Sequence, residues 1–102
     1  MRPLLANPKR ANEARSFHAA VFAKYGSVCI FCGKKGATDA AHVLSKASLG
    51  PLRYADARFA RPAHRACHEA QHAGKATFPK SVIRDAVRAH NQIATVKIQE
   101  PA

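Results

Sequence analysis

The sequence predicts a small α+β domain that is held together by a zinc ion and flanked by an N-terminal and a C-terminal helix. Its 102 residues suffice for one domain with a thin core, because alanine inflates the 47 % hydrophobic fraction and tryptophan is absent. Two short motifs, Cys29-x-x-Cys32 and His64-x-x-Cys67, have the spacing of metal-binding turns. Helical patterns precede and follow these motifs, so we expect residues 1–102 to form a single domain.

The chain is strongly basic, with 17 Lys and Arg against 6 Asp and Glu and a formal net charge of +11. Such a charge is typical of a domain that binds a polyanion, because neutralising phosphates releases counterions. A merely solubilising basic surface and ribosome association are the alternatives. Three cysteines, two of them in one motif, favour metal ligation in a reducing compartment over a disulfide framework. No apolar run reaches membrane-spanning length and the N-terminus does not resemble a signal peptide, so we expect a cytoplasmic protein with no membrane partner.

The N-terminal third is predicted to be an arm followed by a helix. Residues 1–10 contain two prolines and three basic residues, and form either an arm that follows DNA or a frayed end. A helical pattern runs from Ala11 to Tyr25, where Phe17 and Val21 share a face, and Gly26 ends it.

The next segment, Cys29-x-x-Cys32-Gly33, predicts a compact zinc turn in which backbone amides point at the sulfurs and glycine permits a left-handed conformation. A redox dithiol is the alternative, but it requires a thioredoxin-like context that the sequence lacks. With the second motif, the chain supplies a Cys₃His zinc set of Cys29, Cys32, His64 and Cys67. His68 can replace His64 because it adjoins Cys67, but His64 repeats the two-residue spacer and is preferred.

Two short strands and two helices are predicted in the remainder. The first strand covers residues 37–44 and contains His42; after the loop 45–57, the second returns antiparallel over 57–60. A helix over 64–73 is ended by Gly74, and a last helix covers 79–93. On the last helix, the sequence predicts an apolar face formed by Val82, Ile83, Ala86, Val87 and Ile93. The opposite side is predicted to carry a basic stripe formed by Lys80, Arg84 and Arg88.

Three histidines remain once His64 binds zinc. His68 and His72 lie one helical turn apart, so both can bind one divalent ion. Folding the predicted hairpin onto this helix brings His42 close to them. The alternative is that His68 and His72 are ordinary polar residues on a solvated helix.

These motifs resemble a known family. Cys-x-x-Cys, then Ala40-Ala41-His42-Val43, then Cys67-His68-x-x-x-His72 are similar to the HNH, or ββα-metal, nucleases, and most of all to the small phage and prophage recombination nucleases of the NinG and YbcO type. The resemblance covers residues 25–75. It implies a ββα-metal core with a structural zinc, a DNA endonuclease activity with His42 as general base, and a catalytic Mg²⁺ or Mn²⁺ bound by His68 and His72. It also implies 5′-phosphate and 3′-hydroxyl products.

The chain departs from the family pattern at two positions. Ala41 stands where the family often has a metal-binding residue, and Asp39 is the nearest carboxylate that can join the catalytic ion, although strand alternation places it opposite His42. The family's middle asparagine is missing near Phe59, and Asp56 or Arg58 are the candidates to replace it.

The expected partner is double-stranded or branched DNA, with a recombinase as a further candidate. The candidate phosphate or base contacts are Lys46, Arg53, Tyr54, Arg58, Arg61, Arg65, Lys80, Arg84 and Arg88. Two other functions remain open. One is a non-catalytic zinc-finger module that binds nucleic acid, and the other is a structural zinc ribbon that mediates protein contacts.

Overall fold

The computed structural model describes residues 8–99 of the chain. Its elements are α1 (Pro8–Tyr25), β1 (Asp39–His42), α2 (Lys46–Leu49), two short 3-10 helices η2 (Gly50–Leu52) and η3 (Ala57–Phe59), β2 (Ala60–Ala63), α3 (Arg65–His72) and α4 (Lys80–Gln99). The fold is therefore α+β, as predicted. Of the arm expected over residues 1–10, the last three residues belong to α1 and the first seven lie outside the described residues.

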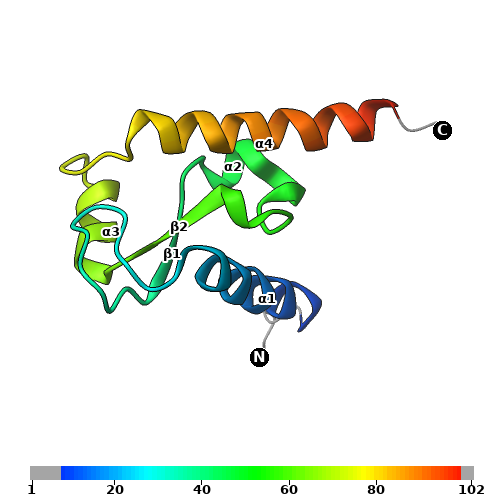
Figure 1. Cartoon of the computed structure of the whole chain (residues 1–102). Helices are drawn as coiled ribbons and strands as arrows, with labels where there is room; N and C mark the ends of the chain where they lie inside the picture. Colours follow the sequence, from blue (N-terminus) through cyan, green and yellow to red (C-terminus); the bar gives the residue numbers. More distant parts are fainter. Residues whose placement is uncertain (1–7, 100–102) are drawn as a thin grey trace.

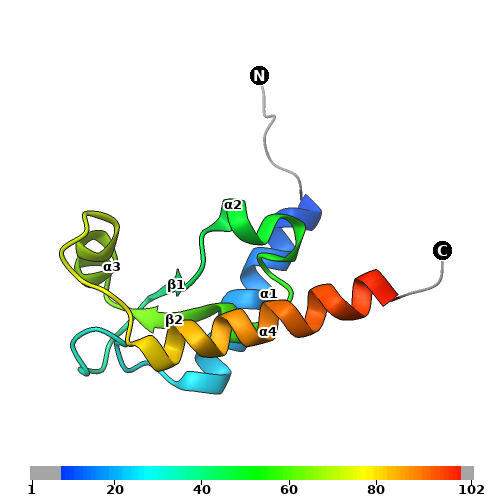
Figure 2. The same cartoon turned by 90° about the horizontal axis from the view of Figure 1, so that it is seen from above.

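A two-stranded antiparallel sheet forms the centre of the molecule. The register pairs Asp39 with Ala63 and His42 with Ala60. Helices α1 and α4 lie on either side of this hairpin, and α3 follows it at one end of the molecule (Figure 1). The view from above shows the same arrangement, with α3 at one end and the C-terminal half of α4 at the other (Figure 2).

Two apolar clusters lie against the hairpin. The first joins α1, α4 and the segment between the strands, and its buried members are Phe17, Val21, Leu49, Phe59, Ala60 and Ala89. The second surrounds the cysteine motifs, and its buried members are Cys29, Ala37, Ala41, Ala63 and Phe78. Alanines of the hairpin belong to both clusters, because small side chains let helices and turns approach the strands closely.

The second strand lies three residues later than predicted. The sequence placed it at 57–60, but residues 57–59 form η3, whose N-cap Asp56 accepts a hydrogen bond from the amide of Arg58. The strand itself contains Pro62, which argues against a strand in a sequence pattern. Its antiparallel pairing with the first strand is confirmed.

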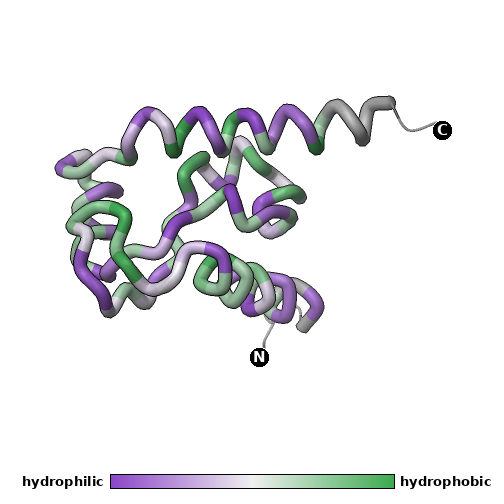
Figure 3. Tube along the Cα trace, in the orientation of Figure 1, coloured by the Kyte–Doolittle hydropathy of each residue, from purple (hydrophilic) through white to green (hydrophobic). Residues whose placement is uncertain are grey.

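The last helix is longer than predicted and its apolar face is narrower. It continues to Gln99, beyond the expected end at residue 93. Figure 3 shows hydrophilic and hydrophobic residues alternating along its N-terminal half. Ala86 and Ala89 are fully buried, whereas Ile83 and Val87 are 38 % and 40 % exposed, so only part of the predicted apolar face packs against the core. Within residues 8–99, no helix combines the length and the hydropathy needed to cross a bilayer.

Candidate functional site

The two cysteine motifs meet in one cluster. The ligand atoms of Cys29, Cys32, His64 and Cys67 all lie within 4.8 Å of one another, which is the donor set of a structural zinc site. Gly33 follows the first pair with a φ of +76°, and its amide donates to the carbonyl of Cys29, so the turn has the predicted left-handed glycine. The cluster can hold a zinc ion.

His64 is oriented for ligation through Nδ1. Its Nε2 lies 2.9 Å from the carbonyl oxygen of Lys35, so Nε2–H donates to this carbonyl and Nδ1 keeps its lone pair. Nδ1 lies 3.3 Å from Sγ of Cys32, inside the cluster. His64, which is also the N-cap residue of α3, is therefore the histidine that completes the zinc set, as the spacing predicted; the alternative, His68, points elsewhere.

The protein prepares one thiol for metal binding. Burial by itself raises the pKa of Cys29. Backbone amides of His64, Cys32 and Phe31 that point at its sulfur have the larger effect, and the pKa is lowered overall to about 6. The pKa of Cys67 is raised to about 11 by burial and by its neighbours Cys29 and Cys32. The thiolate is the form of a cysteine that binds zinc, and this pKa favours it at Cys29 near neutral pH.

His42 lies at the end of β1 in a half-buried position. Its Nε2 is 2.8 Å from the carbonyl oxygen of Arg53, so Nε2–H donates there and Nδ1 is left as the free acceptor. The ring stacks on Phe17 of α1, with ring centroids 5.1 Å apart and an interplanar angle of 16°. Burial, together with the charges of Lys46 and His68, lowers the pKa of His42 to about 4, so the imidazole is neutral at pH 7.

Asp39, His68 and His72 form a polar chain. Oδ2 of Asp39 lies 3.1 Å from Nδ1 of His68, and Nε2 of His68 lies 3.1 Å from Nε2 of His72. Burial raises the pKa of Asp39, but the hydrogen bond from His68 and the charge of Arg65 lower it more, so Asp39 is ionised. An ionised Asp39 holds the proton of His68 on Nδ1, which leaves Nε2 of His68 with a lone pair beside His72.

Two adjoining hollows bring these residues together. One of about 460 Å³ is lined by His42, Lys46, His68 and His72 among others, and one of about 380 Å³ is lined by Asp39, His42, Lys46, Arg65 and His68 among others. The sequence expectation that His42 approaches His68 and His72 is consistent with this shared wall. Strand alternation places Asp39 on the face of β1 opposite His42. Asp39 still lines the smaller hollow, because its carboxylate contacts His68 of α3.

His18 is a site residue that the sequence did not single out. It lines the smaller hollow, stacks on Phe22 and lies with Nε2 2.8 Å from the carbonyl oxygen of Thr38. It lies one position after Phe17 in a helix, and no local spacing relates it to the other histidines. Only the packing of α1 against β1 places it near them.

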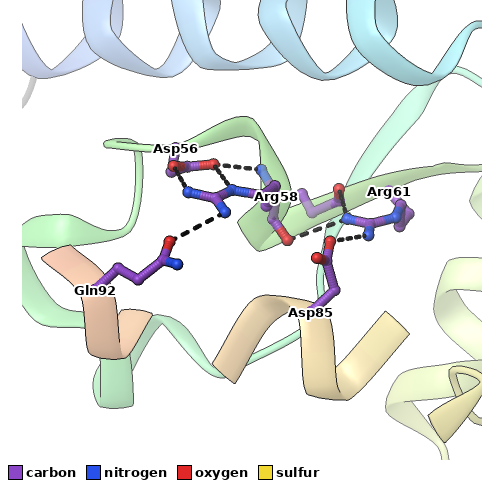
Figure 4. A network of polar contacts seen from close by, with 6 residues as sticks. Asp56, Arg58, Arg61, Asp85 and Gln92 are labelled. Carbon is purple, nitrogen blue, oxygen red and sulfur yellow. Dashed lines mark hydrogen bonds and ion pairs between the residues drawn. The ribbon is translucent and has the colours of Figure 1, made fainter. Parts of the chain in front are cut away.

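Two of the predicted phosphate contacts have structural partners instead. Arg58 donates to both carboxylate oxygens of Asp56 and to Gln92 of α4, so the two candidates for the missing asparagine bind each other (Figure 4). Arg61 is 6 % exposed and pairs with Asp85 of α4 at 2.8 Å. The expectation that Arg61 contacts nucleic acid is wrong, because its guanidinium is buried between helices. The guanidinium of Arg58 is likewise used, in its hydrogen bonds to Asp56 and Gln92.

The remaining basic candidates divide into two surfaces. Lys46, Arg53, Tyr54 and Arg65 lie around His42: Lys46, Tyr54 and Arg65 line the hollows, and Arg53 holds His42 with its carbonyl. Lys80, Arg84 and Arg88 are exposed on α4. Their hollow of about 250 Å³, which Lys80 and Arg84 share with Ile83, is separate from those lined by His42.

No family model, curated protein or solved structure matches this chain.

Proposed function

We propose that this protein is a metal-dependent DNA endonuclease with an HNH, or ββα-metal, core. The observation that carries the proposal is the common cavity of His42, His68 and His72, in which a backbone carbonyl holds one nitrogen of His42 and leaves the other free. The order β1, β2, α3 with a Cys₃His cluster beside it supports the same assignment.

His42 is the proposed general base. Donation from Nε2–H to the carbonyl of Arg53 fixes the ring and the tautomer, so Nδ1 accepts the proton of the attacking water. The carbonyl of Arg53 thus orients His42, whereas Asp56 and Arg58, the candidates for the missing asparagine, bind each other. With its pKa lowered to about 4, His42 is fully available in the neutral form, and the negative charge of a bound phosphate raises its basicity.

His68 and His72 are the proposed ligands of a divalent ion. Their Nε2 atoms are 3.1 Å apart, and two nitrogens that share one ion in neighbouring positions at about 2.1 Å each lie roughly 3 Å from one another. Asp39 acts as a positioning residue, because it bonds to the far nitrogen of His68. When bound, the ion supplies Lewis-acid stabilisation of the phosphate and of the leaving 3′ oxygen.

The donor set favours a transition-metal ion over Mg²⁺. Imidazole nitrogen is a borderline ligand, whereas Mg²⁺ prefers oxygen. Of the two ions that the resemblance implies, Mn²⁺ therefore fits the pair of histidines better. The net charge of +11 supports DNA as the substrate, and the resemblance to phage recombination nucleases is what supports a place in DNA recombination, with a recombinase as a candidate partner.

Nicking of supercoiled plasmid tests the proposal. Wild type and His42→Ala are compared in Mn²⁺, Mg²⁺ and no added ion, with His90→Gln as the matched control, because His90 lies on α4 against Phe59 and outside the cavity. We expect His42→Ala to lose about 100-fold or more of the rate, which is what a general base contributes, while His90→Gln nicks normally.

Zinc content and DNA affinity complete this experiment. Zinc content should be unchanged in His42→Ala, because the residue is not part of the zinc cluster, and DNA affinity should change little, because the basic residues around the cavity are kept. Equal nicking by wild type and His42→Ala would refute the nuclease assignment. Tight DNA binding with no cleavage of plasmid or of circular single-stranded DNA in any ion would instead identify a non-catalytic zinc module.

A further inference from the structure

Tyr54 lies directly beside the proposed general base. Its ring centroid is 5.9 Å from that of His42 and 5.5 Å from that of Phe17, and both pairs are tilted rather than stacked. The guanidinium of Arg53 lies 5.7 Å from the Tyr54 ring centroid. Tyr54 is only partly buried, so an aromatic surface with a cation beside it reaches solvent next to His42.

Tyr54 also separates two hollows. On one side is the hollow of about 380 Å³ that it lines with His42 and His68; on the other is a hollow of about 660 Å³ that lies between the N-terminal half of α1 and residues 54–57. Together with the hollow at His72, three concavities follow one another past α3, β1 and α1. His42 and His68 lie between the first two, and Tyr54 and Phe17 lie between the last two.

This arrangement suits an unpaired strand better than a duplex. The bases of a duplex are stacked inside a regular rod, so their faces cannot reach a side chain within a concavity. An unpaired strand can place its bases in successive hollows and stack them on aromatic and guanidinium groups. The hollows have the volume of small-molecule pockets, which is enough for a nucleotide base.

We propose that Tyr54 stacks an unpaired base next to the scissile phosphate, so that the substrate of this site is single-stranded DNA or a strand unpaired at a branch. This inference rests on the proposed nuclease for the position of the scissile phosphate. The stacking itself depends only on Tyr54, Arg53 and the hollows beside them.

Binding of oligonucleotides tests the stacking separately from cleavage. Fluorescein-labelled oligo-dT and a duplex of equal length are titrated without added divalent ion, using wild type, Tyr54→Ala and the ring-preserving control Tyr54→Phe. Loss of one base–aromatic stack corresponds to about a 5- to 150-fold loss of affinity. We expect this loss for Tyr54→Ala with oligo-dT, little change for Tyr54→Phe, and little effect of either variant on duplex binding. Equal affinity of wild type and Tyr54→Ala for oligo-dT overturns the proposal.

A fluorescent variant covers the case in which Tyr54→Ala does not fold. The chain has no tryptophan, so Tyr54→Trp introduces a single tryptophan at the stacking position. Oligo-dT should quench its emission by stacking, and the duplex should not. An oligo-dT complex without quenching, or equal quenching by the duplex, overturns the proposal. Quenching by oligo-dT in a protein that nicks no DNA leaves the stacking site in place while the nuclease assignment fails.

Discussion

Replacing Arg61 with alanine should destabilise the fold far more than replacing its partner Asp85. The guanidinium of Arg61 pairs with Asp85 and donates to the carbonyls of Arg58 and Ala60 (Figure 4). It also lies 4.0 Å from the ring centroid of Tyr25. It thereby connects β2 with α1 and α4. The side chain of Arg61 is 8 % exposed, and that of Asp85 is 40 % exposed.

This difference in exposure sets the magnitudes. Arg61→Ala leaves two carbonyls without a donor, at about 1–3 kcal/mol each, and opens a cavity between the helices, so we expect a total cost of about 3–5 kcal/mol. Asp85→Ala leaves a guanidinium that keeps its two carbonyls and the Tyr25 ring, so we expect a cost of about 1–2 kcal/mol. A domain of this size has a free energy of unfolding of roughly 5–15 kcal/mol, so Arg61→Ala removes a large part of it.

Urea unfolding of the zinc-loaded protein, followed by circular dichroism, measures both costs. Arg61→Lys is the matched variant that keeps the charge but lacks the planar group, and it should lie between wild type and Arg61→Ala. The salt dependence of DNA binding by Arg61→Lys should equal that of wild type, because a buried residue neutralises no phosphate. A cost below 1 kcal/mol for Arg61→Ala, or an equal cost for Asp85→Ala, would show that the reasoning from burial is incorrect.

Three further outcomes are expected. Cys29→Ser should lower the zinc content measured by mass spectrometry and unfold the region around the motifs, whereas Ser27→Ala, a nearby exposed change, should do neither. Asp39→Asn should weaken Mn²⁺ binding, measured by calorimetry, by about 10- to 100-fold, and an unchanged affinity would contradict the positioning role. His42 has a lowered pKa of about 4, so between that value and about 6.5 the unfolded chain binds a proton that the folded chain does not. The free energy of unfolding should therefore fall on acidification through this range, by at most about 3 kcal/mol from this group. An NMR titration midpoint of His42 near 6.5 would exclude this contribution.

The zinc set was predictable from sequence because its ligands lie in two local motifs. The two-residue spacing within each turn favoured His64 over His68 as the fourth ligand. In the structure the carbonyl of Lys35 orients the ring of His64 so that it joins the three cysteines. The left-handed Gly33 and the end of α1 at Gly26 followed from single residues. Local chemistry thus sufficed wherever a feature was made by neighbours in the chain.

Features made by distant residues were not predictable. Arg61 appeared to be one more basic residue because its burial depends on Asp85 and Tyr25, which come from two helices that flank the hairpin. Arg53 contacts His42 through its backbone carbonyl, which every residue type has, so the residue type at this position does not predict the contact. The second strand was predicted at the wrong position because Pro62 lies within it and is unusual in a strand, and because the short helix capped by Asp56 occupies residues 57–59.

The two sides of the proposed reaction centre are built on different apolar clusters. The stack of His42 on Phe17 belongs to the side built by α1, which contains no zinc ligand, whereas His68 and His72 belong to the helix that begins at the cysteine motifs. Withdrawal of zinc should therefore melt one half of the molecule before the other. When zinc is scarce, the chain would then stay partly folded around α1, and supplying the ion would refold the half that contains the cysteine motifs without new synthesis.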